Sequence, residues 1–175
     1  MSRALRSVRG CLFAALATVA VTACGGEKGV FQAQTGEAII SLSEGPCFGT
    51  CPIYDMTLKP NGDYVLNAER FVKKEGVSEG NMGGQAWMDA EKTLRDAGFW
   101  NLEPVQTMDT LQNCHTDAPT TKVTWRDAEG KEKTVTYYAG CGVQKMNDLI
   151  RGLRVAMKFE DLVWTEDRFD PRGNR

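Results

Sequence analysis

Cysteines and a single histidine are the residues of this 175-residue chain whose types and spacing could do chemistry. Cys47 and Cys51 are separated by three residues and are followed directly by Pro52, while His115 lies far along the chain. Two thiolates and an imidazole suit copper, and a closely spaced cysteine pair can also exchange disulfides. The pattern therefore predicts either a metal or redox site at Cys47, Cys51 and His115, or a structural disulfide.

Structural bridging is the interpretation that the spacing favours. Redox pairs usually have two intervening residues rather than three, and no Lys, Arg or His lies beside Cys47 to favour its thiolate form. A structural zinc site would need four closed ligands. Four cysteines allow three pairings, which the sequence does not resolve, and we expect the local ones, Cys47 with Cys51 and Cys114 with Cys141. We expect no bound cofactor and no resident metal.

The segment between the first two cysteines has to turn back sharply. Residues four apart lie about 13 Å from each other in an extended chain, whereas a disulfide needs Cα atoms within roughly 7 Å. Gly49 makes such a turn feasible because it lacks a side chain. We therefore define a candidate functional loop, which consists of Phe48, Gly49, Thr50, His115 and Asp117.

Hydrolytic chemistry has little support in the sequence. His115 is the only histidine, so a Ser-His-Asp arrangement would have to use it together with Asp117 or Asp109. The segment 116–121 is better explained as a turn in which the oxygens of Asp117 and of the threonine side chains bond nearby backbone amides and Pro119 fixes the entry to the next strand. We expect a protein without enzymatic activity.

Residues 1–23 have the three regions of a lipoprotein signal peptide. A start with three arginines precedes the apolar stretch Cys11–Ala20, which is too short to span a bilayer as a mature helix. Small residues then lead to Cys24, where we expect cleavage and acylation of the new N-terminus. Gly25 replaces the aspartate that retains many lipoproteins at the inner membrane, so in a Gram-negative host we expect outer-membrane placement facing the periplasm.

Charge argues against nucleic acid as a partner. Loss of residues 1–23 would leave 18 basic against 23 acidic residues, a net charge of −5 with no basic run. The expected membrane contact is the N-terminal lipid itself, and an envelope protein or a glycan is the expected binding partner. Tryptophan and tyrosine side chains could line such a binding face, although they more often pack in the core.

One domain is expected, because about 150 residues suffice for a single core. We expect the acylated cysteine and a flexible tether at 24–36, a domain at 37–164 and a polar tail at 165–175. Residues 76–84 are expected to form a loop, and residues 103–119 an irregular stretch. Alternating and helical periodicities predict an α+β fold with a mainly antiparallel sheet from two hairpin regions and two helices on one face. The expected strands are 38–42, 53–58, 64–68, 121–125 and 134–138, with Phe71-Val72 as an extension or a further strand, and the expected helices are 85–97 and a second after Gly142.

Three segments together carry a family resemblance: Gly45–Asp55, Cys114–Thr120 and Tyr138–Cys141. They resemble an uncharacterised bacterial family, the domain of unknown function 6438 (DUF6438), over roughly residues 38–164. The resemblance implies an exported or lipid-anchored bacterial protein, and it implies no activity. We therefore expect an envelope lipoprotein that acts as a non-catalytic binding or structural module, with a periplasmic copper-binding or thiol-redox protein as the alternative.

Overall fold

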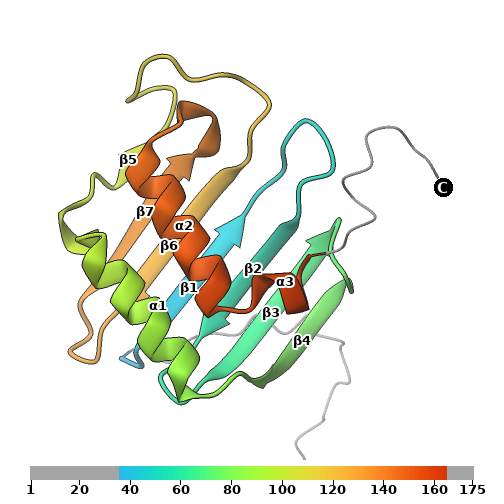
Figure 1. Cartoon of the computed structure of the whole chain (residues 1–175), viewed down its shortest axis with the longest axis vertical. Helices are drawn as coiled ribbons and strands as arrows, with labels where there is room; N and C mark the ends of the chain where they lie inside the picture. Colours follow the sequence, from blue (N-terminus) through green and yellow to red (C-terminus); the bar gives the residue numbers. More distant parts are fainter. Residues whose placement is uncertain (1–35, 165–175) are drawn as a thin grey trace, which may run out of the picture. The chain divides into compact units, whose positions relative to one another are not determined.

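The computed structural model describes residues 36–164, so the predicted signal peptide, Cys24, most of the tether and the polar tail lie outside the described residues. The described chain forms a sheet with helices on one face (Figure 1). None of the helices in this part of the chain is long and apolar enough to cross a membrane. The elements are β1 (Ile39–Glu44), β2 (Ile53–Leu58), β3 (Asp63–Arg70), β4 (Gly76–Asn81), α1 (Gly84–Asp96), η1 (Phe99–Asn101), β5 (Val105–Gln106), β6 (Thr120–Arg126), β7 (Glu132–Tyr138), η2 (Ala139–Cys141), α2 (Gln144–Ala156) and α3 (Phe159–Leu162).

Strand β1 lies at the centre of the sheet and joins two hairpin regions. The seven strands follow the order β4-β3-β2-β1-β6-β7-β5, and every neighbouring pair is antiparallel except β5 with β7. The predicted α+β class and the two hairpin regions are therefore confirmed.

Alternation along the strands separates a buried face from a polar one. Ile40 pairs with Leu58 on one side and Trp125 on the other, and all three side chains are fully buried. The same register extends this face through Leu42, Met56, Leu66, Val123 and Val135. Burial of these apolar side chains under the helices forms the core.

Helices α1 and α2 cover this buried face side by side (Figure 1). Their buried positions recur at three- and four-residue steps, as predicted. α1 ends before Gly98, whose φ of 59° is the left-handed conformation expected of a helix-terminating glycine. Gly152 permits close approach of the helices, since a Cβ there would lie 2.6 Å from Cγ2 of Thr93.

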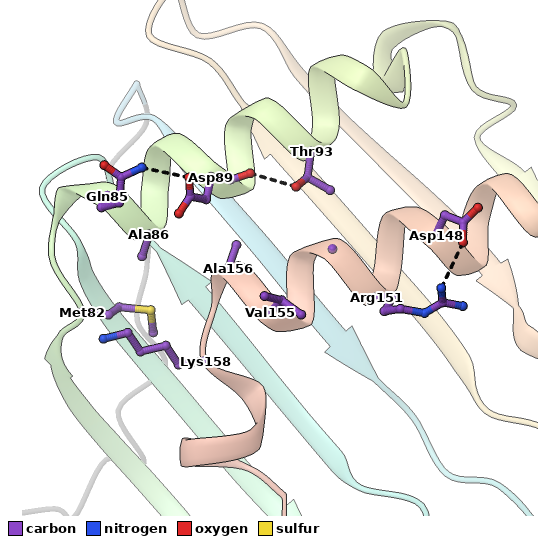
Figure 2. A pocket seen from close by; sticks show the side chains of 11 residues that line it. Met82, Gln85, Ala86, Asp89, Thr93, Asp148, Arg151, Val155, Ala156 and Lys158 are labelled. Atoms are coloured by element: carbon purple, nitrogen blue, oxygen red, sulfur yellow. Dashed lines mark hydrogen bonds and ion pairs between the residues drawn. The ribbon is translucent and has the colours of Figure 1, made fainter.

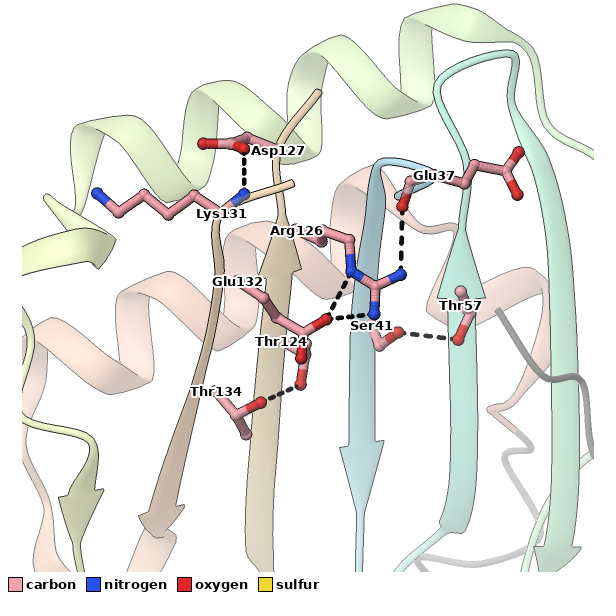
Figure 3. A network of polar contacts seen from close by, with 9 residues as sticks. All are labelled: Glu37, Ser41, Thr57, Thr124, Arg126, Asp127, Lys131, Glu132 and Thr134. Atoms are coloured by element: carbon pink, nitrogen blue, oxygen red, sulfur yellow. Dashed lines mark hydrogen bonds and ion pairs between the residues drawn. The ribbon is translucent and has the colours of Figure 1, made fainter. Parts of the chain in front are cut away.

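The opposite face of the sheet carries short polar side chains. A row of hydroxyls crosses four neighbouring strands at Thr57, Ser41, Thr124 and Thr134 (Figure 3). Oγ of Ser41 lies 2.9 Å from Oγ1 of Thr57, and the Thr124 and Thr134 hydroxyls are 2.7 Å apart. Such a face is typical of an antiparallel sheet with one side in water.

Two sequence predictions are wrong between residues 71 and 81. Residues 76–81 form strand β4 rather than a loop, because the complete ladder with β3 outweighs the low strand propensity of two glycines and an asparagine. Phe71 does not extend β3, because its φ of 54° turns the chain out of the extended conformation. The irregular stretch 103–119 also contains the two-residue strand β5, and the short helix α3 follows α2.

Candidate functional site

Both disulfides lie at one end of the sheet, where β1 and β7 end and β2 and β6 begin. We call this region the disulfide end and define it as residues 45–52, 107–119 and 139–143. Backbone bonds join its segments: the Gly45 N–H donates to the Thr120 carbonyl at 2.9 Å, and the Ala139 N–H donates to the Pro119 carbonyl at 3.0 Å. In Figure 1 these loops gather at the top of the sheet.

The cysteines pair locally, as expected. Cys47 is bonded to Cys51 with Cα atoms 5.8 Å apart, and Cys114 is bonded to Cys141 with Cα atoms 4.0 Å apart. In this state the sulfurs are bonded to each other, and the described residues contain no group of three His, Cys, Asp or Glu side chains that could hold a metal ion. The geometry therefore gives the copper alternative no support.

Phe48 projects from the tip of the first disulfide loop, and 87% of its surface is exposed. Its backbone N–H donates to the Asp117 carbonyl at 3.2 Å, so the first loop is joined to the second. Gly49 has a φ of 152°, a conformation that residues with side chains rarely adopt. Thr50 is also exposed. The candidate loop thus presents an aromatic ring on a constrained backbone.

His115 and Asp117 contribute to this end mainly through their backbones. The His115 N–H donates to the Gly140 carbonyl at 3.0 Å, and Asp117 has a φ of 75°. The Asp117 carboxylate accepts a bond from the Thr116 hydroxyl at 3.2 Å, whereas we had predicted bonds to nearby backbone amides. The Ala118 N–H instead donates to the Tyr138 hydroxyl at 3.2 Å. Both side chains are exposed, and the chain bends at Thr116 and Asp117, whereas Thr120 and Thr121 already belong to β6.

A glycine is required at position 140 because the loop that contains His115 approaches it closely. A Cβ at this position would lie 2.2 Å from the His115 carbonyl oxygen and 2.5 Å from Cε1 of Tyr138. We expect Gly140→Ala to lower the free energy of unfolding by about 1–3 kcal/mol, measured by denaturant unfolding. Gly45→Ala is the matched control, because a Cβ there would meet only the Thr120 oxygen at 3.6 Å. Equal effects of both substitutions would contradict this explanation.

A buried ion pair lies next to the disulfide end, and it was not predicted from the sequence. Glu44 is the last residue of β1, its side chain is 1% exposed, and its carboxylate accepts bonds from Arg154 of α2 at 2.6 and 2.9 Å. The Tyr54 hydroxyl donates to the same carboxylate at 3.1 Å. The alternation of Ile40, Leu42 and Glu44 on one face was the available signal, because it places a carboxylate at a core position.

Burial and charge alter the titration of two members of this cluster. Burial raises the pKa of Tyr54 well above its ordinary value, and the neighbouring Glu44 carboxylate raises it further. Burial alone would lower the pKa of Arg154, but the charge and hydrogen bonds of Glu44, together with those of Tyr54, outweigh burial and raise the pKa. Both shifts keep Tyr54 neutral and Arg154 charged, which is the arrangement the carboxylate requires.

A separate groove lies between α1 and α2 and contains none of the predicted site residues (Figure 2). Its volume is about 740 Å³, and Met82, Ala86, Val155 and Ala156 supply its apolar part. Its polar side chains include internal pairs, since Gln85 donates to Asp89 at 2.9 Å and Arg151 lies 3.3 Å from Asp148.

The family model of the domain of unknown function DUF6438 matches residues 38–155. The chain belongs to this family. The matched range contains both disulfides, the disulfide end and the Glu44–Arg154 pair, so the DUF6438 domain includes the whole candidate site. A comparison with curated proteins finds no match. DUF6438 membership assigns no activity, and the function has to be argued from the geometry.

Proposed function

We propose that this DUF6438 protein is a lipid-anchored binding module of the cell envelope, without catalytic activity, that holds a partner protein at its disulfide end. The observation that carries the proposal is Phe48, whose ring is 87% exposed. Transfer of such a side chain from water into an apolar pocket is favourable by about 1.5–3 kcal/mol. Buried aromatic anchors are typical of the few residues that dominate protein interfaces.

The backbone beneath Phe48 favours this role because several bonds constrain it before any partner binds. The Cys47–Cys51 bond closes the loop, and Pro46 and Pro52 restrict the backbone on either side. The second disulfide, Cys114–Cys141, braces the loop whose carbonyl accepts the Phe48 N–H. A preformed loop loses little conformational entropy on binding, which raises affinity.

Charge indicates what the partner surface should look like. The disulfide end contains Asp109 and Asp117 and has no Lys or Arg. A pocket that accepts the Phe48 ring and is bordered by neutral or basic side chains would complement it. We therefore favour an envelope protein over a glycan as the partner.

The proposed anchor is compatible with this surface. Lipidation at Cys24 would attach the chain through the residues that precede β1, and β1 runs from Ile39 towards the disulfide end, which it reaches at Glu44. The anchor therefore joins the domain at the opposite end of the central strand. We place the protein at the outer membrane, facing the periplasm.

Site-specific photocrosslinking in cells tests the binding surface. A photoreactive amino acid at position 48 should give one adduct of defined mass, whereas the same group at Val155 should not. Val155 is a suitable control because it is 75% exposed and lies on α2. Identical adducts at both positions, or none at position 48, would reject the disulfide end as the binding surface. An adduct that disappears on glycan digestion would replace the protein partner with a glycan.

Metabolic labelling with a tagged fatty acid tests the anchor. The unaltered chain and a Cys11→Ala variant should take up the label, and Cys24→Ala should not, since only Cys24 ends the lipoprotein signal. Label in Cys24→Ala would contradict acylation at this residue. Recovery of the labelled chain with the inner membrane would contradict outer-membrane placement.

A further inference from the structure

Strand β4 forms an outer edge of the sheet, and this edge has few of the usual protections. All six of its residues pair with β3 without a register shift, and five of the six are exposed. It contains neither lysine nor proline, and in residues 36–164 no strand pairs with its outer side. The other edge strand, β5, has only two residues. A long exposed edge is a template for pairing with another strand, and natural sheets usually block it.

One antiparallel register of β4 with a second copy of itself places no like charges opposite each other. If Ser78 pairs with Ser78 of a second copy, Val77 lies opposite Glu79, and Gly76 lies opposite Gly80. Small residues then meet on the face that carries the helices, where the Tyr64 ring of β3 lies over Gly80. The alternative register centred on Glu79 would place two carboxylates opposite each other, which is unfavourable.

The net charge of the edge segment does not oppose contact between two copies. Residues 73–81 contain Lys73, Lys74, Glu75 and Glu79, so the segment has no net charge. Val77 is 54% exposed on the open face of the sheet and would be partly covered by the added strand.

We propose that β4 pairs with β4 of a second copy of this chain about a two-fold axis at Ser78, so that the two sheets become continuous. The symmetry is the commonest one among soluble homo-oligomers. The contact is limited to one strand from each copy, so we expect a weak, reversible dimer. The inference is independent of the function proposed for Phe48, which lies at the disulfide end.

Analytical ultracentrifugation of the chain from Gly25 to Arg175 tests the dimer. The average mass should rise from one chain towards two between about 10 µM and about 1 mM, the range of weak interfaces. The outward-facing backbone amides of β4 should exchange hydrogen more slowly over the same range. Val77→Glu should weaken the dimer about tenfold or more, because it places a carboxylate opposite Glu79 of the second copy.

Val155→Glu is the matched control, because it adds the same charge at an exposed valine on α2 and should leave the dimer unchanged. Thermal unfolding of both variants checks that the fold is retained. A chain that stays monomeric to about 1 mM would overturn the proposal. Equal weakening by the two glutamate substitutions would do the same. If dimers form only after residues 165–175 are deleted, the tail occupies the edge, and the proposal is also wrong.

Discussion

Arg154→Leu is expected to lower the free energy of unfolding by about 3 kcal/mol. The substitution leaves the Glu44 carboxylate buried with Tyr54 as its remaining side-chain donor, and removal of one member of a buried ion pair typically costs 3–5 kcal/mol. The Arg154 side chain is 37% exposed, so water reaches the pair, and we expect the lower end of that range. Denaturant unfolding of the chain from Gly25 to Arg175 measures the change.

Arg151→Leu is the matched control for this prediction. Arg151 lies one turn earlier in α2, but its side chain is 70% exposed and its ion pair with Asp148 is at the surface. Exposed pairs contribute about 0–1 kcal/mol, so a small effect is expected. The double variant Glu44→Leu with Arg154→Leu should recover most of the lost stability, since it removes both charges. Equal losses in the two single arginine variants would show that charge burial is not the cause.

The position of the ion pair connects the core to the disulfide end. Glu44 precedes Gly45 directly, and Tyr54 lies near the start of β2, so the carboxylate holds the two strand ends that frame the first disulfide loop. The guanidinium also lies 4.9 Å from the centroid of the Phe159 ring, which joins α3 to the same cluster. We infer that this polar cluster positions the loop that presents Phe48.

The elements that the sequence predicted are those in which local pattern and burial agree. β2 was predicted with its observed bounds because Ile53–Leu58 alternates along its whole length. α1 was predicted at 85–97, one residue late at each end of Gly84–Asp96, because its apolar positions form a helical stripe that stops before Gly98. β4 was missed because its own sequence disfavours a strand and only pairing with β3 makes it one. Periodicity in a sequence indicates which positions are buried. A polar edge strand shows no such pattern, because it forms through pairing with a neighbouring strand.

The candidate site was predictable only in part, namely where local features of the sequence determine it. Cysteine spacing indicated local pairing, and the five-residue loop placed Phe48 at a turn. The sequence did not show that the Asp117 carbonyl accepts the Phe48 N–H, nor that Arg154 reaches Glu44, because both contacts join residues far apart in the chain. Contacts of this kind require the folded arrangement of the sheet and α2.

Removal of the Cys114–Cys141 disulfide is expected to destabilise the domain by about 3.6 kcal/mol, and removal of Cys47–Cys51 by about 2 kcal/mol. The difference arises because the sequence separations are 27 and 4 residues, and closing a longer loop restricts the unfolded chain more. Alanine pairs at each site avoid new polar groups. Denaturant unfolding of the two double variants under non-reducing conditions measures both values.

The two bridges should also differ in their effect on the proposed binding surface. Loss of Cys47–Cys51 should abolish the photocrosslink at position 48 at a cost of about 2 kcal/mol in stability, because this bridge shapes the loop that carries the ring. The Gly152→Ala variant is the control, since a Cβ there would lie 2.6 Å from Cγ2 of Thr93, outside the disulfide end, and should destabilise the fold by about 1–3 kcal/mol while both loops stay closed. If both variants lose the photocrosslink equally, general destabilisation explains the loss. If only the variant without the Cys47–Cys51 bond loses the photocrosslink, the constrained backbone is what makes Phe48 a binding residue.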